Sequence, residues 1–120
     1  MNGKTDVKRD NESRILAAIR AIPRGQIAGY GEVARRAGLP GRARLVARVL
    51  RGNTDPALPW HRVLRSDGRI AMAVDSPGYL EQTQRLRAEG LMVVDGRVKG
   101  VRASPSREDV LDEQVWGMPD

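Results

Sequence analysis

The first regular pattern of apolar residues in this chain lies just before Pro23. Four apolar residues recur there at the three- and four-residue spacing of one helix face: Ile15, Leu16, Ile19 and Ile22. The pattern predicts a helix over residues 13–22, which ends at the proline. Residues 1–11 are polar and lack this periodicity, so we expect them to form a flexible N-terminus.

Two shorter helices are expected next, with a glycine-containing turn between them. The first is predicted over residues 31–37 and the second over residues 42–51. A short helix, a turn and a second helix form the outline of a helix-turn-helix. The second helix carries three arginines at positions i, i+4 and i+7, which share one face of a helix: Arg44, Arg48 and Arg51.

Short apolar runs alternate with turn residues in the rest of the chain. Residues 63–70 predict a small winglike hairpin, and residues 91–98 predict a second hairpin around Asp95-Gly96. A helix is expected between them, over residues 78–89. The sequence therefore predicts a small α/β fold that is mainly helical, in a single domain over residues 12–103.

Charge divides the chain into a basic body and an acidic tail. The formal net charge is +6, from 21 Lys and Arg against 15 Asp and Glu. Residues 1–103 hold 20 of the basic and 10 of the acidic residues, which leaves one basic and five acidic residues in the tail, 104–120. A basic body favours a polyanionic partner such as nucleic acid. The tail also holds apolar residues, and three states stay open for it: a partner-binding segment, a helix packed on the domain, or disorder.

The chain lacks the residues that several kinds of site require. It has no cysteine and one histidine. This excludes a disulfide framework, a thiolate or multi-histidine metal site and cysteine catalysis. No apolar run is long enough to cross a membrane. We expect a cytoplasmic, nucleoid-associated monomer without cofactor or metal.

Five short motifs then occur in a fixed order. They are Gly25-Gln26-Ile27-Ala28-Gly29-Tyr30, Ala43-Arg44-Leu45-Val46, Arg51-Gly52-Asn53, Pro59-Trp60-His61-Arg62-Val63 and Glu89-Gly90. In this order and spacing the motifs resemble the C-terminal domain of the O6-alkylguanine-DNA alkyltransferases. Trp60 stands where those enzymes have the cysteine that accepts the alkyl group. The chain thus resembles the alkyltransferase-like proteins, which recognise alkylated guanine without repairing it.

The resemblance implies a pocket for an extruded base. Its expected residues are Tyr30, Trp60, His61, Met72, Ala73, Val74 and Glu89. His61 and Glu89 match the pair that activates the cysteine in the enzymes, and here they have no thiol to activate. Residues 72–74 match the pocket rim that touches the alkyl group.

The resemblance also implies a DNA-binding surface. Its expected residues are Tyr30, Arg44, Arg48, Arg51 and Arg62. Arg44 matches an arginine that enters the duplex and fills the gap left by the flipped base, and Tyr30 matches a tyrosine that contacts the neighbouring phosphate. Arg62 is expected either to reach the DNA backbone or to brace the pocket. Asn53 is expected to have a structural role at a helix end.

The sequence therefore predicts a protein that recognises O6-alkylguanine in double-stranded DNA and is not an enzyme. The resemblance implies that the bound protein marks the lesion for nucleotide excision repair proteins. Two other functions stay open. One is a sequence-specific helix-turn-helix transcription regulator that is indifferent to lesions, and the other is a true alkyltransferase with an unusual acceptor residue.

Overall fold

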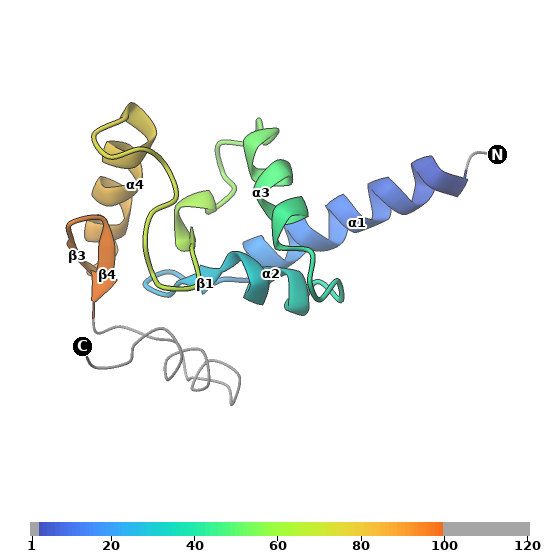
Figure 1. The fold of residues 1–120 in the computed structure, drawn as a ribbon, viewed down its shortest axis with the longest axis horizontal. Helices are drawn as coiled ribbons and strands as arrows, with labels where there is room; N and C mark the ends of the chain where they lie inside the picture. Colours follow the sequence, from blue (N-terminus) through green and yellow to red (C-terminus); the bar gives the residue numbers. More distant parts are fainter. Residues whose placement is uncertain (1–2, 100–120) are drawn as a thin grey trace.

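Four helices, a 3-10 turn and two small sheets make up the described part of the chain (Figure 1). The structure is a computed structural model that describes residues 3–99. The acidic tail, with its open alternatives, lies outside the described residues. The elements are α1 (Gly3–Arg20), β1 (Ala28–Gly29), α2 (Tyr30–Arg36), α3 (Ala43–Arg51), η1 (Trp60–Arg62), β2 (Val63–Leu64), α4 (Pro77–Ala88), β3 (Met92–Val94) and β4 (Arg97–Lys99).

Helix α1 is longer than the apolar pattern predicted. Its C-terminal half buries Ile15 and Ile19 fully, as expected. The helix begins at Gly3, however, so most of the segment expected to be a flexible N-terminus is helical and projects from the body (Figure 1). The apolar pattern missed this part because its one apolar residue, Val7, is exposed and has no apolar neighbour at helical spacing. An exposed i,i+4 ion pair between Asp10 and Arg14, at 3.0 Å, supports it.

The predicted helix-turn-helix is formed by α2 and α3. The turn between them uses Gly38 and Gly41, which have φ of 79° and 82°, values that glycine adopts without strain. Val33 of α2 and Val46 of α3 are fully buried and pack with the α1 isoleucines in a first hydrophobic cluster. The arginine-bearing side of α3 is thereby left toward solvent.

The predicted hairpin over residues 63–70 is wrong in its pairing. Val63 and Leu64 pair in parallel with Ala28 and Gly29 instead of folding back on residues 69–70. The chain does reverse after β2, where the Arg65 amide donates to the Arg69 carbonyl at 2.9 Å. Both β2 residues are buried, at 2% and 1% exposure, whereas one face of a hairpin arm on the surface would be exposed. The burial of β2 on both faces therefore decided its pairing, and the turn residues at 66–68 did not.

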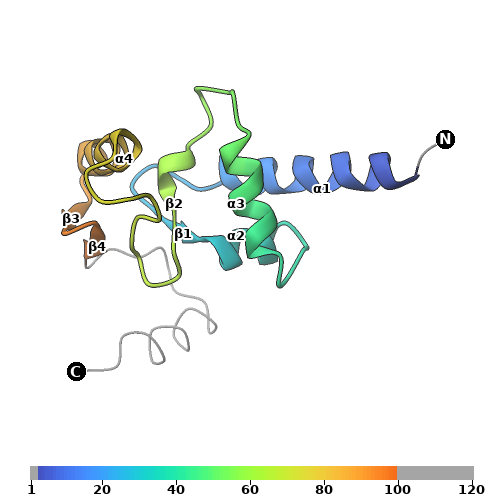
Figure 2. The same ribbon diagram turned by 45° about the horizontal axis from the view of Figure 1, so that its top comes forward.

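The second predicted hairpin and the helix before it are confirmed. β3 and β4 pair antiparallel, with Val93 opposite Val98, and α4 begins at Pro77 after the N-cap residue Ser76. Val93, Val98 and Leu86 belong to a second hydrophobic cluster. This part lies beside the three N-terminal helices in both ribbon views (Figures 1 and 2). No helix among residues 3–99 is long and apolar enough to cross a membrane.

Strand β2 joins the two clusters. Val63 packs in the first cluster and Leu64, the next residue, packs in the second. Successive residues of a strand point to opposite faces, so this short strand contributes to both cores. Turn η1 precedes it directly, and the fold therefore fixes residues 60–62 at the junction of the two parts (Figure 2). The small, mainly helical α/β fold is confirmed.

Candidate nucleic-acid interface and base pocket

Trp60 begins turn η1 and lies between the two halves of the molecule. Its side chain is partly buried against the first hydrophobic cluster. The His61 ring meets it edge-on, with centroids 6.1 Å apart and planes at 87°. The guanidinium carbon of Arg85, from α4, lies 5.6 Å from the centre of the indole ring. The indole is thus held on several sides, which gives this position a defined π surface.

Glu89 organises the residues after Trp60. Its carboxylate accepts a hydrogen bond from Arg62 Nη2 at 2.8 Å and from the Gly25 amide at 2.8 Å. The same carboxylate lies 2.6 Å from His61 Nε2, and Arg62 Nε adds contacts of 3.0 and 3.1 Å to its two oxygens. Its side chain is 8% exposed. This set of contacts joins η1, the turn after α1 and the end of α4.

These contacts decide the charge state of Glu89. Burial alone would raise the pKa of this carboxyl. Hydrogen bonds from Arg62, the Gly25 amide and His61 outweigh the burial and lower the pKa from 4.5 to about 2. Glu89 is therefore ionised at neutral pH and its charge is offset within the protein.

Arg62 faces inward. Besides its contacts with Glu89, its Nη1 donates to the Ile22 carbonyl at 2.8 Å, and the side chain is 16% exposed. All three guanidinium nitrogens are thus engaged inside the protein. Of the two roles expected for Arg62, the geometry favours a brace inside the protein over a contact with DNA.

Gln82 is a site residue that the sequence did not indicate. It is 3% exposed, and its amide nitrogen donates to the carbonyls of His61 and Val63 at 3.1 and 3.0 Å. These bonds tie η1 to α4. Among the described residues, the Nδ1 atom of His61 is buried without a hydrogen-bond partner. Nothing in the apolar pattern of α4 distinguishes Gln82 from a surface glutamine.

Tyr30 opens helix α2 next to two basic residues. Its side chain is half-buried against the first cluster. Burial raises the pKa of its hydroxyl, while the positive charges of Arg51 and Arg65 act in the opposite direction. Arg51 is the last residue of α3, and Arg65 follows β2. A phenol beside two exposed guanidinium groups suits contact with a phosphate. The sequence did not point to Arg65.

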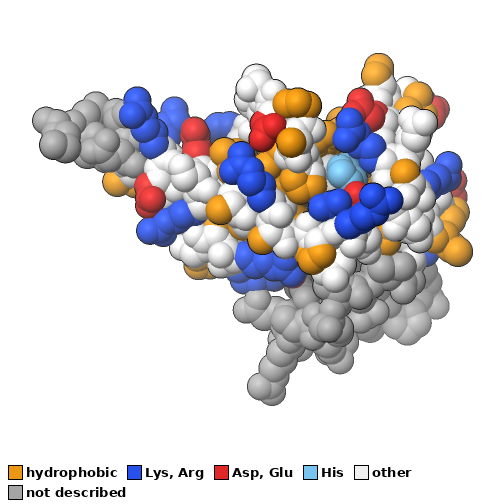
Figure 3. Space-filling view, turned by 180° about the vertical axis from the view of Figure 1, so that it is seen from behind, with side chains coloured by type: hydrophobic (Ala, Val, Ile, Leu, Met, Phe, Trp, Pro, Cys, Tyr) orange, Lys and Arg blue, Asp and Glu red, His pale blue; other side chains and the backbone are white. Residues whose placement is uncertain are grey.

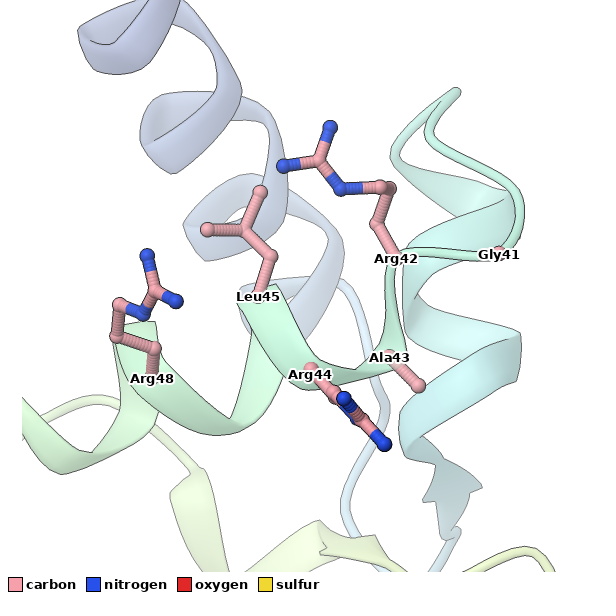
Figure 4. Close-up of a pocket in the computed structure, with 6 residues that line it drawn as sticks. All are labelled: Gly41, Arg42, Ala43, Arg44, Leu45 and Arg48. Atoms are coloured by element: carbon pink, nitrogen blue, oxygen red, sulfur yellow. The ribbon is translucent and has the colours of Figure 1, made fainter.

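The three arginines predicted on α3 are all exposed. Arg44 and Arg48 line an open cavity of about 400 Å³ at the start of this helix. In Figure 4 the Arg48 side chain extends to the same side as Arg42 and Leu45, and Arg44 extends away from them. The two arginines lie one turn apart along the helix, yet they reach in different directions. Arg44 and Arg48 can therefore contact different groups of a bound partner.

The remaining predicted residues are Asn53 and the loop at residues 72–74. Asn53 bonds the Asp55 backbone in both directions, donating to its carbonyl and accepting from its amide at 3.0 Å each, a local turn after α3. In the loop expected to form the rim, Val74 is 73% exposed, Ala73 is exposed, and Met72 is 37% exposed with its sulfur beside Gly78 of α4. The loop therefore lies over the start of α4.

A space-filling view from behind shows how these groups meet the surface (Figure 3). Basic side chains are spread over this face, and the single histidine is visible among them, with hydrophobic surface nearby. His61 is 7% exposed, so only its edge reaches the surface. Among the described residues, no group of three His, Cys, Asp or Glu side chains is placed to hold a metal ion.

Residues 10–91 match the family described as 6-O-methylguanine DNA methyltransferase, DNA binding domain. The chain belongs to this family. A DNA base-flipping protein of Vibrio parahaemolyticus is 43% identical over 82 residues, which cover 67% of this chain and 79% of that protein. Alkyltransferase-like protein 1 of Schizosaccharomyces pombe is 35% identical over 82 residues, covering 68% of this chain and 76% of that protein.

The fold of this family member also matches a solved structure. It is the crystal structure of S. pombe Atl1 in complex with damaged DNA containing O6-carboxymethylguanine, with a TM-score of 0.70 and 30% identity. The match covers 81% of this chain and 97% of that one. The predicted resemblance to alkyltransferase-like proteins is confirmed. The names of these relatives and the lack of cysteine together support a non-enzymatic member of the family.

Proposed function

We propose that this protein recognises O6-alkylguanine in double-stranded DNA by rotating the damaged nucleotide into the pocket at Trp60, without transferring the alkyl group. One observation carries the proposal. His61 and Arg62, which follow the acceptor position in the family motif, both bind the Glu89 carboxylate, while the acceptor position itself holds an indole. A thiolate is the nucleophile in alkyl transfer, and an indole offers no equivalent electron pair.

Selectivity for the lesion follows from its chemistry. Alkylation at O6 removes the N1 proton of guanine and weakens pairing with cytosine. A base with weakened pairing costs less to extrude from the duplex than an intact one. The half-buried indole of Trp60 then offers an apolar surface to the base or its alkyl group. Met72, Ala73 and Val74 would form the rim of this pocket.

The proposed contacts with DNA divide between two kinds. Arg48 and Arg51 are exposed on α3 and would neutralise phosphates, and Tyr30 would contact the phosphate beside the flipped nucleotide. Arg44 extends away from Arg48 and would fill the gap in the base stack with its planar guanidinium (Figure 4). S. pombe Atl1, which shares the fold, was crystallised with damaged DNA, and this supports the DNA partner.

Without alkyl transfer the complex does not turn over. A stable complex on a distorted duplex is a signal that a second repair system can use. We therefore propose that the bound protein, as a monomer in the cytoplasm and nucleoid, marks the lesion for nucleotide excision repair proteins.

The test is a comparison of two duplexes that differ only in one O6-methyl group. Affinity is measured for each by fluorescence anisotropy, and the protein is then analysed by intact-mass spectrometry. Tighter binding to the methylated duplex with unchanged protein mass is the expected result. Equal affinity would refute lesion recognition and favour the transcription-regulator alternative. A mass gain of one methyl group would show that a residue of this chain accepts the alkyl group.

Arg44→Ala separates stacking from general charge attraction. Its matched control is Arg9→Ala, which removes the same charge from an exposed position on α1. Neither arginine is assigned to a phosphate, so the dependence of affinity on salt should stay nearly the same in both variants. Only Arg44→Ala should reduce the ratio of lesion to guanine affinity, because only Arg44 is assigned to the vacated stack. An unchanged ratio would contradict that assignment.

A further inference from the structure

Arg85 lies at the Trp60 indole, and the family motifs assign it no role. It projects from α4, and its guanidinium carbon is 5.6 Å from the indole centre. Trp60 is half-buried against the first hydrophobic cluster, and its ring lies nearly perpendicular to that of His61. The Arg85 guanidinium therefore lies close to any group that contacts the indole. Trp60 occupies the position to which an O6 substituent points in the proposed complex.

The two terminal nitrogens of Arg85 can donate hydrogen bonds to a ligand. Its Nε donates to Glu81, one turn earlier on α4, at 2.8 Å. Within residues 3–99, no partner occupies its two terminal nitrogens. Arg62, by contrast, uses all three of its nitrogens inside the protein. Of Arg62 and Arg85, only Arg85 can offer a pair of donors to a ligand.

The acidic residues near Arg85 do not neutralise its charge, so Arg85 is the cation available to the O6 substituent. Glu89, the nearest buried carboxylate, is held by Arg62, the Gly25 amide and His61. Glu81 binds Arg85, but both side chains of this pair are about half exposed, at 51% and 44%. Solvent screens such an exposed pair, so Glu81 offsets the charge of Arg85 only weakly. The fork of a guanidinium matches the two oxygens of a carboxylate.

We propose that Arg85 reads the charge of the O6 substituent, so that this protein binds O6-alkylguanines with an anionic substituent more tightly than neutral ones of the same size. The substituent in question is a short chain that ends in a carboxylate, as in O6-carboxymethylguanine. This inference rests on the proposed recognition of O6-alkylguanine. Trp60 supplies the surface for the substituent, and the two terminal nitrogens of Arg85 bind its carboxylate.

The test compares four duplexes of one sequence, with guanine, O6-methylguanine, O6-carboxymethylguanine or O6-carbamoylmethylguanine at one position. The last two substituents have nearly the same shape, and only the carboxymethyl group is charged. The full-length protein is expected to favour carboxymethyl over carbamoylmethyl by about tenfold, the value of one charge-assisted hydrogen bond. Arg85→Gln should bring this ratio close to one, and Arg85→Lys should give an intermediate ratio because lysine keeps the charge and loses the fork.

Lys99→Gln is the control for the loss of one positive charge elsewhere. Lys99 is exposed at the end of β4, so its loss should weaken binding to all four duplexes alike and leave the ratio unchanged. Glu81→Gln should raise the ratio only slightly, because Glu81 offsets the charge of Arg85 weakly. Equal binding of the two similar substituents by the unmodified protein, with O6-methylguanine still preferred over guanine, would overturn this inference alone. Loss of any preference over guanine would overturn both proposals.

Discussion

Replacing Glu89 with glutamine should destabilise the fold by about 3 kcal/mol at neutral pH. The carboxylate is 8% exposed and binds Arg62, His61 and the Gly25 amide at 2.6–3.1 Å. Its pKa falls from 4.5 to about 2 on folding. At 1.36 kcal/mol per pKa unit, this difference corresponds to about 3 kcal/mol of stabilisation. Glutamine keeps the size but lacks the charge, and one end of its amide is a donor placed against other donors.

Urea denaturation of both proteins at a series of pH values checks this prediction. Because the native pKa is lowered, the stabilisation is complete above the unfolded pKa and is lost as pH falls from about 5 toward 2. The difference between the two proteins should therefore be about 3 kcal/mol near pH 7 and small near pH 2. Effects of acid on other groups cancel in this comparison. A difference below about 1 kcal/mol at neutral pH, or one that stays constant with pH, would refute the reasoning.

Two further predictions concern Arg62 and the glycines with positive φ. Arg62→Lys should lower the free energy of unfolding by about 2 kcal/mol in the same urea assay. One ammonium group cannot contact Glu89 and the Ile22 carbonyl together. An unchanged urea midpoint would contradict the role of Arg62 as a brace between these two groups. Gly96→Ala should cost more than Gly41→Ala, since both positions have positive φ but a Cβ at 96 would lie 2.7 Å from the Tyr79 hydroxyl while 41 is open. Equal midpoints for the two alanine variants would show that Tyr79 moves aside freely.

Much of the fold could be predicted from local patterns. The α3 helix, the α4 helix and the hairpin at Asp95-Gly96 each carry a strong local signal, and the structure has all three. The pairing of β2 with β1 could not be read in the same way. Their register joins Ala28 to Val63, far apart in the sequence, and a turn signal at residues 66–68 favoured a local hairpin instead. Whether two distant strands pair depends on which residues are buried together, and the local sequence pattern does not show this.

The residues of the candidate site also fall into those that local sequence motifs indicate and those that depend on contacts across space. Trp60, His61 and Glu89 could be named because they belong to ordered motifs, and the structure brings His61 and Glu89 into contact. Gln82 and Arg85 could not be named, since each acts across space on turn η1 from a helix whose sequence is otherwise polar and ordinary. Arg62 was ambiguous for a related reason. Whether an arginine faces DNA or the interior depends on whether a buried carboxylate lies within its reach.

The contacts that hold turn η1 explain how a protein of this family could recognise a lesion without transferring the alkyl group. Glu89 and Gln82 hold η1 through Arg62, the ring of His61 and the carbonyls of His61 and Val63, and none of these bonds involves the side chain at position 60. The shape of the turn is therefore independent of whether residue 60 is a nucleophile. A large aromatic side chain at that position gains contacts with the first hydrophobic cluster and with Arg85. The same contacts could therefore hold the turn in place around a thiol or around the proposed indole surface.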